Sequence, residues 1–291
     1  MATLPERSLE HPLIGPELQQ LAELVAGGGV LALTGAGVST DSGIPDYRDE
    51  AGAWKHRQPM QFREFVGSPA SRQRYWARSV AGWARFRRAQ PNAAHRALAA
   101  LERAGRLSGL VTQNVDGLHE AAGSRDVVDL HGRLDRVVCL GCGAALHRDR
   151  FQQLLLEHNP AWSAAPAAFT PDGDADLGGA DTSRFDVPSC DRCSGIWKPD
   201  VVFFGEHVPA ERVERAMFAL ASSRALLVVG SSLMVFSGFR FARAAARLGI
   251  PIAVVNRGRT RADELAALKL EMNAGEALER VASGVVGRAV S

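Results

Sequence analysis

All four cysteines of this chain lie in two Cys-x-x-Cys pairs, Cys139 with Cys142 and Cys190 with Cys193. Four thiolates from two such pairs match the tetrahedral coordination of a structural Zn²⁺ ion. Because a site with four protein ligands has no open position, the metal would stabilise the fold and take no part in catalysis. Disulfides or idle thiols are the alternative, but a reducing compartment favours a metal, and zinc is favoured over iron.

A glycine-rich turn follows the first apolar run of the chain. Residues 30–33 (Val-Leu-Ala-Leu) predict a buried strand, and residues 34–37 (Thr-Gly-Ala-Gly) follow it directly, with a helix expected from about Val38. The two glycines lack the Cβ atoms that would hold a pyrophosphate away from the backbone, and the N–H groups of the helix would face the anion. The third glycine of a Gly-x-Gly-x-x-Gly fingerprint is missing, so the turn alone is half a dinucleotide signal. Residues 43–48 (Gly-Ile-Pro-Asp-Tyr-Arg) add polar groups that a structural linker would not need.

Three polar residues lie at the end of two further predicted strands or directly after it. Asn114 and Asp116 end the 108–116 segment and alternate along it, so on an extended chain they share one face and can bind an amide. His131 follows the predicted strand 126–130, where an imidazole can act as a general base near neutral pH. The alternatives are a turn built from Asn and Asp and a structural histidine.

Apolar runs alternate with helical patterns along the rest of the chain. Helices are predicted over 18–25, 71–89, 92–107, 210–222, 238–248 and 274–282, and further strands over 198–206, 225–230 and 251–256. This alternation predicts an α/β fold, a Rossmann-like doubly wound parallel sheet whose ligand binds at the strand tips.

The chain divides into three predicted parts. Residues 18–48, 91–135 and 198–291 are assigned to the discontinuous Rossmann-like domain, in which the 198–206 strand continues the main sheet. Residues 49–90 form an inserted loop and helical module, of which 49–68 is a loop that folds over the ligand. Residues 136–197 form a smaller zinc-binding domain, from which a loop at 164–186 hangs.

The composition is that of a globular protein with a sizeable core. The 291 residues are 46% hydrophobic, and 34 basic against 32 acidic residues give a net charge of +2, so neither nucleic acid nor membrane is expected as a partner. Residues 1–12 have no apolar core of a secretory signal, and the longest apolar stretch, 225–229, is too short to cross a bilayer. A cytoplasmic location is expected.

These motifs occur in the order of the sirtuin family, which the sequence resembles over nearly its whole length from about residue 20. The motifs are Gly35-Ala36-Gly37-Val38-Ser39, Gly43-Ile44-Pro45-Asp46-Tyr47-Arg48, Thr112-Gln113-Asn114-Val115-Asp116, His131-Gly132, the two cysteine pairs, Pro199-x-x-Val202-x-Phe204-Gly205-Glu206, Gly230-Ser231-Ser232-Leu233 and Val255-Asn256. Gly230-Ser-Ser-Leu, the 234–239 segment and the cysteine spacing resemble the class II branch, which contains the mitochondrial lipoamidase-type sirtuins.

The resemblance implies an NAD-dependent protein-lysine deacylase that acts on acylated-lysine proteins and has NAD and zinc as cofactors. In that reaction the acyl-lysine oxygen attacks the ribose C1′ as nicotinamide leaves, and the products are nicotinamide, O-acyl-ADP-ribose and free lysine. His131 would take the proton of a ribose hydroxyl, and Asn114 would stand with Asp116 at the nicotinamide. These implied roles make His131 and Asn114 the catalytic residues.

The resemblance also assigns the binding residues. For NAD they are Gly35, Ala36, Gly37, Ser39, Pro45, Asp46, Tyr47, Arg48, Gln113, Asn114, Val115, Asp116, Gly230, Ser231, Ser232, Asn256, Arg257, Gly258 and Ala274. For a protein substrate that enters as an extended strand they are Val202, Phe204, Gly205, Glu206, Val235 and Phe236. Tyr75 and Arg78 share a helix face and resemble the pair that binds acidic acyl chains, with a core tyrosine and a solvated arginine as the alternative.

Three rival functions stay open at this point. Mono-ADP-ribosylation of proteins would use the same NAD site with another acceptor. Hydride transfer is weakened by the incomplete glycine fingerprint. A zinc module that binds nucleic acid through the arginines of residues 72–88 is weakened because they are spread around a helix whose aromatics look like core.

Overall fold

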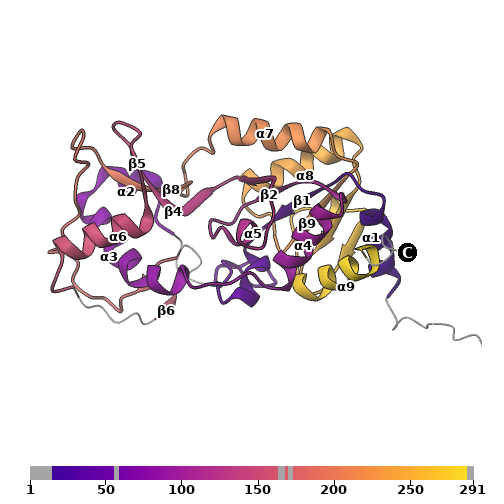
Figure 1. The fold of residues 1–291 in the computed structure, drawn as a ribbon, viewed down its shortest axis with the longest axis horizontal. Coiled ribbons are helices and arrows are strands. Elements are labelled where there is room, and N and C mark those ends of the chain that lie inside the picture. Colours follow the sequence, from indigo (N-terminus) through magenta and orange to yellow (C-terminus); the bar gives the residue numbers. More distant parts are fainter. Residues whose placement is uncertain (1–14, 56–58, 163–167, 170–172, 287–291) are drawn as a thin grey trace, which may run out of the picture.

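The computed structural model describes residues 15–55, 59–162, 168–169 and 173–286, which form an elongated molecule of two lobes (Figure 1). The expectations for residues 1–12, and for part of the 164–186 loop, fall outside the described residues. None of the described helices is both long and apolar enough to span a membrane.

A six-stranded parallel sheet forms the centre of the larger lobe. Its strands are β1 (Val30–Thr34), β2 (Leu107–Thr112), β3 (Val127–Asp129), β9 (Ala225–Val229), β10 (Ile252–Val255) and β11 (Leu268–Leu270). Across the sheet the order is β3-β2-β1-β9-β10-β11, and every neighbouring pair is parallel. The predicted doubly wound, Rossmann-like order is therefore confirmed, with its switch point between β1 and β9.

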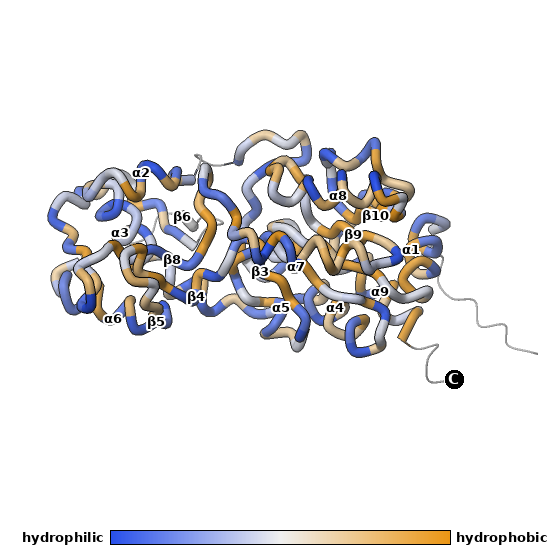
Figure 2. Tube along the Cα trace, turned by 90° about the horizontal axis from the view of Figure 1, so that it is seen from above, coloured by the Kyte–Doolittle hydropathy of each residue, from blue (hydrophilic) through white to orange (hydrophobic). Residues whose placement is uncertain are grey.

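Helices cover both faces of this sheet, because successive side chains of a strand point to opposite sides. Val30 and Ala32 of β1 share one core with α1 (Pro16–Ala26), α4 (Ala93–Arg103) and α9 (Ala274–Val286). Leu31 and Leu33 share the other core with α7 (Ala210–Ala221) and α8 (Phe236–Leu248). Figure 2 shows the apolar backbone segments of β9 and β10 between these helices. A strand buried on both faces reads as a continuous apolar run, which is why β1 and β9 were recognisable.

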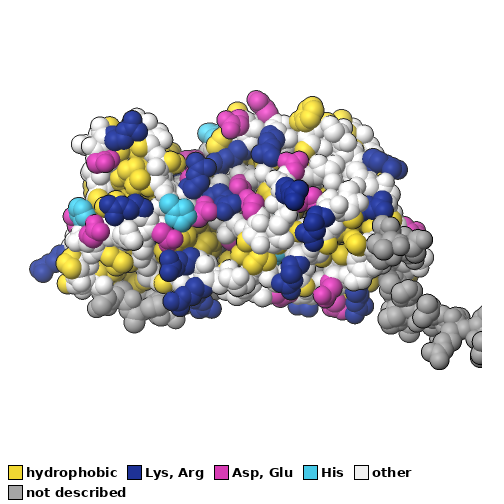
Figure 3. Space-filling model, viewed as in Figure 1, with side chains coloured by type: hydrophobic (Ala, Val, Ile, Leu, Met, Phe, Trp, Pro, Cys, Tyr) yellow, Lys and Arg dark blue, Asp and Glu magenta, His cyan; other side chains and the backbone are white. Residues whose placement is uncertain are grey.

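The smaller lobe has its own antiparallel sheet, in the order β5-β4-β8. Its strands are β4 (Gly132–Cys139), β5 (Ala145–His147) and β8 (Trp197–Val201). Three helices pack on it, α2 (Phe62–Gly67), α3 (Pro69–Phe86) and α6 (Arg148–His158), and a short two-stranded sheet joins β6 (Ala168–Phe169) to β7 (Ala175–Asp176). The core of this lobe is aromatic, with Phe65, Trp76, Phe151 and Trp197 among its buried side chains. On the face drawn in Figure 3, Lys and Arg side chains lie on both lobes with Asp and Glu among them.

Three sequence predictions about these elements are wrong. The 198–206 strand does not continue the main sheet, because β8 ends at Val201 and pairs antiparallel with β4. No α-helix begins at Val38; two 3₁₀ turns follow instead, and they end at Gly43, whose φ of 81° and the nearby Pro45 prevent continuation. The 108–116 segment leaves the sheet after Thr112. Helices α2 and α6 and strand β11 were not predicted, since each is short or weakly amphipathic.

A chain of buried hydrogen bonds runs beneath the tips of β1 and β2. Thr34 Oγ1 donates to Thr112 Oγ1 at 2.9 Å and lies 2.9 Å from His119 Nε2, and Thr112 Oγ1 accepts from the Asn114 N–H at 3.1 Å. The His119 ring packs on that of His95, with centroids 4.8 Å apart. Both imidazoles are fully buried, so they belong to the core and not to the surface.

These imidazoles should link folding to pH. Burial lowers the pKa of His95 from 6.5 to about 4 and that of His119 well below 6.5. In this pH range the two imidazoles bind protons in the unfolded chain but stay unprotonated in the folded chain. The free energy of unfolding should therefore fall as the pH drops from about 6.5 towards 4. Urea unfolding at a series of pH values measures this slope. It should be shallower in His119→Gln and unchanged in His147→Gln, whose side chain is 60% exposed. Equal slopes in both variants would contradict the assignment.

Candidate active site

The strands of the main sheet end in register. Thr34 lies opposite both Thr112 and Val229, while Thr112 lies opposite Asp129 and Val229 opposite Val255. Because the strands are parallel, the residues after these positions all emerge at one edge of the sheet. The segments that meet there begin at Gly35, Gln113, Leu130, Gly230 and Asn256.

A cavity of about 560 Å³ lies at this edge. The predicted site residues that line it are Gly35, Ala36, Gly37, Ser39, Pro45, Asp46, Tyr47, Arg48, Tyr75, Gln113, Asn114, Val115, Asp116, His131, Val202, Phe204, Glu206, Gly230, Ser231, Ser232, Val235, Asn256, Arg257 and Ala274. The predicted site residues that are not among its lining are Arg78, Gly205, Phe236 and Gly258.

The glycines after β1 and β9 let two turns pack against each other. Gly37 N–H donates to Gly230 O at 2.8 Å. A Cβ on Gly37 would lie 2.9 Å from that oxygen, and a Cβ on Gly35 would lie 2.7 Å from Ser231 Cβ. Gly230 itself has a φ of 57°, and a Cβ on it would lie 2.5 Å from Val38 N. The glycines are thus required because the two turns pack against each other, whereas the sequence analysis explained them by the approach of a pyrophosphate alone. The turns still line the cavity.

Ser39, Asn114 and Asp116 form a hydrogen-bonded group on one wall. Ser39 Oγ donates to Asp116 Oδ2 at 2.7 Å and accepts from Asn114 Nδ2 at 3.0 Å. The other carboxylate oxygen of Asp116 accepts from the Leu118 N–H at 2.9 Å. Burial raises the pKa of Asp116, whereas the bonds from Leu118 and Ser39 oppose that rise. All three residues line the cavity, although Asn114 and Asp116 lie on a loop and not on a strand.

His131 is held as a neutral base. Its Nδ1 lies 2.9 Å from Gln113 O, which can only accept, so Nδ1 carries the proton. The lone pair of Nε2 then accepts from Ser237 Oγ at 2.8 Å. Burial lowers the pKa of His131 to about 4; the Gln113 bond opposes this, and the charges of Arg212 and Arg240 add to it. The unprotonated Nε2 is the atom that can accept a proton from a substrate.

Ser237 lies within the 234–239 segment of the class II resemblance, but no individual role at the site was predicted for it. It directly follows Val235 and Phe236, and it lines the cavity beside His131. The reasoning also missed Trp54, which packs edge-on against both Tyr47 and Phe204 at centroid distances of 6.2 Å or less and lies 4.0 Å from the Arg48 guanidinium carbon.

Tyr75 and Arg78 are not brought together at the cavity. Tyr75 is buried and lines it. Arg78 Nε instead donates to Ala175 O at 3.0 Å and lies 4.0 Å from Asp174 Oδ2, in the small lobe. An acidic acyl chain needs a cation within reach of the pocket, so the predicted pair does not form such a subsite here.

Glu206 has a structural partner in addition to its place in the lining. Its Oε2 accepts from the buried ammonium of Lys198 at 3.1 Å and from the Phe203 N–H at 2.8 Å. Burial lowers the pKa of Lys198, and the charge of Glu206 opposes this. The carboxylate therefore braces the 202–206 segment.

The four cysteines come together at the far end of β4 and β8. Cys139 Sγ lies 3.5 Å from Cys193 Sγ and Cys142 Sγ lies 3.8 Å from Cys190 Sγ, and all four sulfurs are within 4.8 Å of one another. Zinc–sulfur bonds of about 2.3 Å in a tetrahedron place the sulfurs about 3.8 Å apart. The thiols are free, so the four donors fit one zinc ion.

Loss of this metal should cost stability. Cys142→Ser should bind less zinc and lower the melting temperature by about 5 °C or more, because a structural zinc contributes to folding. Ser189→Ala is the matched control, since Ser189 is exposed and adjoins Cys190 without being a ligand. Metal content and thermal melting are the measurements. Equal zinc content in the two variants would contradict the four-cysteine site.

Comparison with known proteins identifies the family. Residues 35–237 match the model of the Sir2 family. The chain is 58% identical over 264 residues to the "NAD-dependent protein deacetylase" of Xanthomonas campestris pv. campestris (strain 8004), which covers 91% of this chain and 89% of that protein. It is 57% identical over 268 residues to the protein of the same name from Bordetella bronchiseptica, with 92% and 98% covered.

Solved structures give the same result. The chain resembles a structure described as "Sir2-p53 peptide-NAD+" with a TM-score of 0.74 and 29% identity, over 94% of this chain and 99% of that one. A structure described as "Structural Basis for the Mechanism and Regulation of Sir2 Enzymes" matches with a TM-score of 0.71 and 30% identity, over 94% and 98%. The chain belongs to the Sir2 family, the sirtuins.

Proposed function

We propose that this protein is an NAD-dependent protein-lysine deacetylase. The observation that carries the proposal is one continuous cavity that is lined both by the glycine turns of a doubly wound sheet and by a buried, neutral histidine. The names of the Xanthomonas and Bordetella relatives support the same activity. NAD is the proposed co-substrate, and zinc the structural metal.

NAD would lie along the strand tips. The turn at 35–37, with Asn256 and Arg257, lines one part of the cavity, while Asn114 and Asp116 line another. The hydrogen-bonding capacity that remains on the Asn114 and Asp116 side chains suits the carboxamide of nicotinamide. Bound NAD supplies an electrophilic ribose carbon when nicotinamide leaves, and an acyl-lysine oxygen is the nucleophile.

His131 serves as the general base. Its unprotonated Nε2 would accept the proton of a ribose hydroxyl, and the oxygen of that hydroxyl would then attack the acyl carbon. The low pKa of His131 keeps the imidazole neutral until that step. Because Ser237 Oγ donates to Nε2, the base reaches the ribose either after Ser237 moves aside or through Ser237 as a relay. Water would then add to the same acyl carbon and the lysine amine would leave, so the proposed products are nicotinamide, O-acyl-ADP-ribose and free lysine.

The acyl pocket favours a neutral chain. Tyr75 lies with Met60, Ile44 and Phe86 in the lining, and the nearby Arg78 is engaged by Ala175 and Asp174. We therefore propose acetyl and longer apolar acyl groups over acidic ones. The acylated protein would enter as an extended strand between Val202–Glu206 and Val235.

Assignment to class II, with its lipoamidase-type members, belongs to the same proposal and rests on the Gly230-Ser-Ser-Leu233 motif and the cysteine spacing. Four free thiols that can share a metal favour a reducing compartment, so we place the protein in the cytoplasm. Mono-ADP-ribosylation would use the same NAD contacts and is the alternative activity.

Removal of the base tests this function. His131→Ala should lower the turnover of an acetyl-lysine peptide by about 10²- to 10⁴-fold, because general-base catalysis contributes on that scale. The fold and the zinc content should be unchanged, as shown by circular dichroism and metal analysis. His158→Ala, a partly exposed histidine of the small lobe, is the matched control and should keep full activity. Undiminished turnover in the His131 variant would overturn the assignment.

A further inference from the structure

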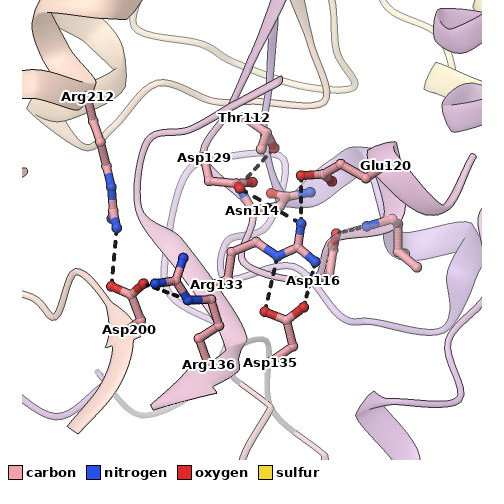
Figure 4. A network of polar contacts seen from close by, with 11 residues as sticks. Thr112, Asn114, Asp116, Glu120, Asp129, Arg133, Asp135, Arg136, Asp200 and Arg212 are labelled. Carbon is pink, nitrogen blue, oxygen red and sulfur yellow. Dashed lines mark hydrogen bonds and ion pairs between the residues drawn. The ribbon is translucent and has the colours of Figure 1, made fainter. Parts of the chain in front are cut away.

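Arg133 connects three elements next to the candidate active site (Figure 4). Its guanidinium makes a two-pronged contact with Asp135, Nη2 to Oδ2 at 2.6 Å and Nε to Oδ1 at 3.2 Å. Nη1 donates to Glu120 Oε1 at 2.6 Å and lies 3.8 Å from Asp129 Oδ2. Arg133 thus ties β4 to the end of β3 and to the short helix α5 (Leu118–Ala121). Its side chain is only 22% exposed, so these contacts are screened less than those of a surface pair.

The same guanidinium packs against the loop that carries Asn114 and Asp116. Gly117 has a φ of 72°, and a Cβ there would lie 2.4 Å from Arg133 Nη2 and 2.8 Å from Cζ. The next residue of β4, Leu134, donates its N–H to Val115 O at 3.0 Å. The loop is therefore fixed from the β4 side by one backbone bond and by the flat face of one side chain.

We propose that Arg133 is a positioning residue for the NAD reaction, which holds the loop of residues 114–118 in place and so sets where the Asp116 carboxylate stands. The inference rests on the proposed function, in which Asp116 faces nicotinamide. Arg133 touches neither substrate nor reacting atoms; it acts through Gly117 and Asp116. The loop also contacts the turn after β1 through Ser39, so Arg133 supports it from a second element.

The charge of Arg133 supports this role. Burial raises the pKa of Asp116, and Arg133 opposes that rise together with the bonds from Leu118 and Ser39. The pKa of Asp129, beside the guanidinium, is raised to about 7, chiefly by burial and by the charge of Glu120, with a smaller effect of Asp135. The charges of Arg133 and Arg212 oppose this rise. The groups that face Arg133 are thus acidic, and removal of its charge leaves Asp116 easier to protonate.

Arg133→Gln should weaken NAD binding by about tenfold, because a support with charge-assisted hydrogen bonds is lost. The loss of NAD affinity on the acid side should begin at a higher pH than in the wild type, since the Asp116 pKa rises when the cation is removed. Nicotinamide should inhibit the NAD reaction of Arg133→Gln less strongly than that of the wild type. Arg133→Lys keeps the charge without the planar fork. It should therefore recover part of the NAD affinity and part of the wild-type pH dependence. Calorimetric titration with NAD over a series of pH values measures them.

Arg136→Gln is the matched control. Arg136 lies on the same strand and pairs with Asp200 at 3.6 Å, away from the loop, and should leave NAD affinity and its pH dependence unchanged. A purely structural role predicts a lower melting temperature in Arg133→Gln with no shift of the acid limb, and that result would overturn the proposal. If Arg133→Gln does not fold, Arg133→Lys decides: an NAD affinity equal to that of the wild type would then overturn it. NAD binding needs no acyl peptide, so a wild type that binds NAD but deacylates nothing would refute the proposed function and leave this inference testable.

Discussion

The site depends on one constraint, the contact of two turns at the switch point of the sheet. Strands β1 and β9 end in register, and the turn after each must pass within hydrogen-bond distance of the other, Gly37 N–H to Gly230 O at 2.8 Å. No side chain larger than hydrogen fits at Gly35 or Gly37 without a shift of the neighbouring turn. Once this junction is fixed, the residues after β2, β3 and β10 open into the same crevice, and a long ligand can lie across five strand ends.

The chemistry of the crevice follows from its burial. A histidine in water is half protonated near pH 6.5, whereas buried His131 stays neutral well below that pH and keeps its Nε2 available. The same desolvation makes a carboxylate harder to ionise, and Asp116 is surrounded by compensating donors, Ser39 on one oxygen and Leu118 N–H on the other. Base and carboxylate are thus tuned in opposite directions by one environment, which is a common way to divide roles in an active site.

The sequence was sufficient for features that depend on local pattern. Continuous apolar runs identified β1 and β9, and most of the residues that the motifs singled out line the cavity, Asn114 and His131 among them. It was insufficient wherever distant parts of the chain decide the outcome. The strand predicted at 198–206 fits either sheet, and only the pairing of β8 with β4 places its first residues in the small lobe. Arg78 has the right spacing from Tyr75, but Asp174 and Ala175, nearly a hundred residues on, draw it away from the pocket. Ser237 lies in the 234–239 segment, but only the fold brings its hydroxyl to His131.

The central claim is that this crevice couples cleavage of NAD to removal of an acyl group from lysine. Mass spectrometry of the purified protein with NAD and lysine peptides that carry acetyl, longer apolar, lipoyl, succinyl or glutaryl groups tests it most directly. We expect one nicotinamide released for each lysine freed, with the acyl group recovered on ADP-ribose and with neutral acyl chains cleaved in preference to acidic ones. Intact acyl-lysine together with ADP-ribose attached to protein, or formation of NADH, would contradict it.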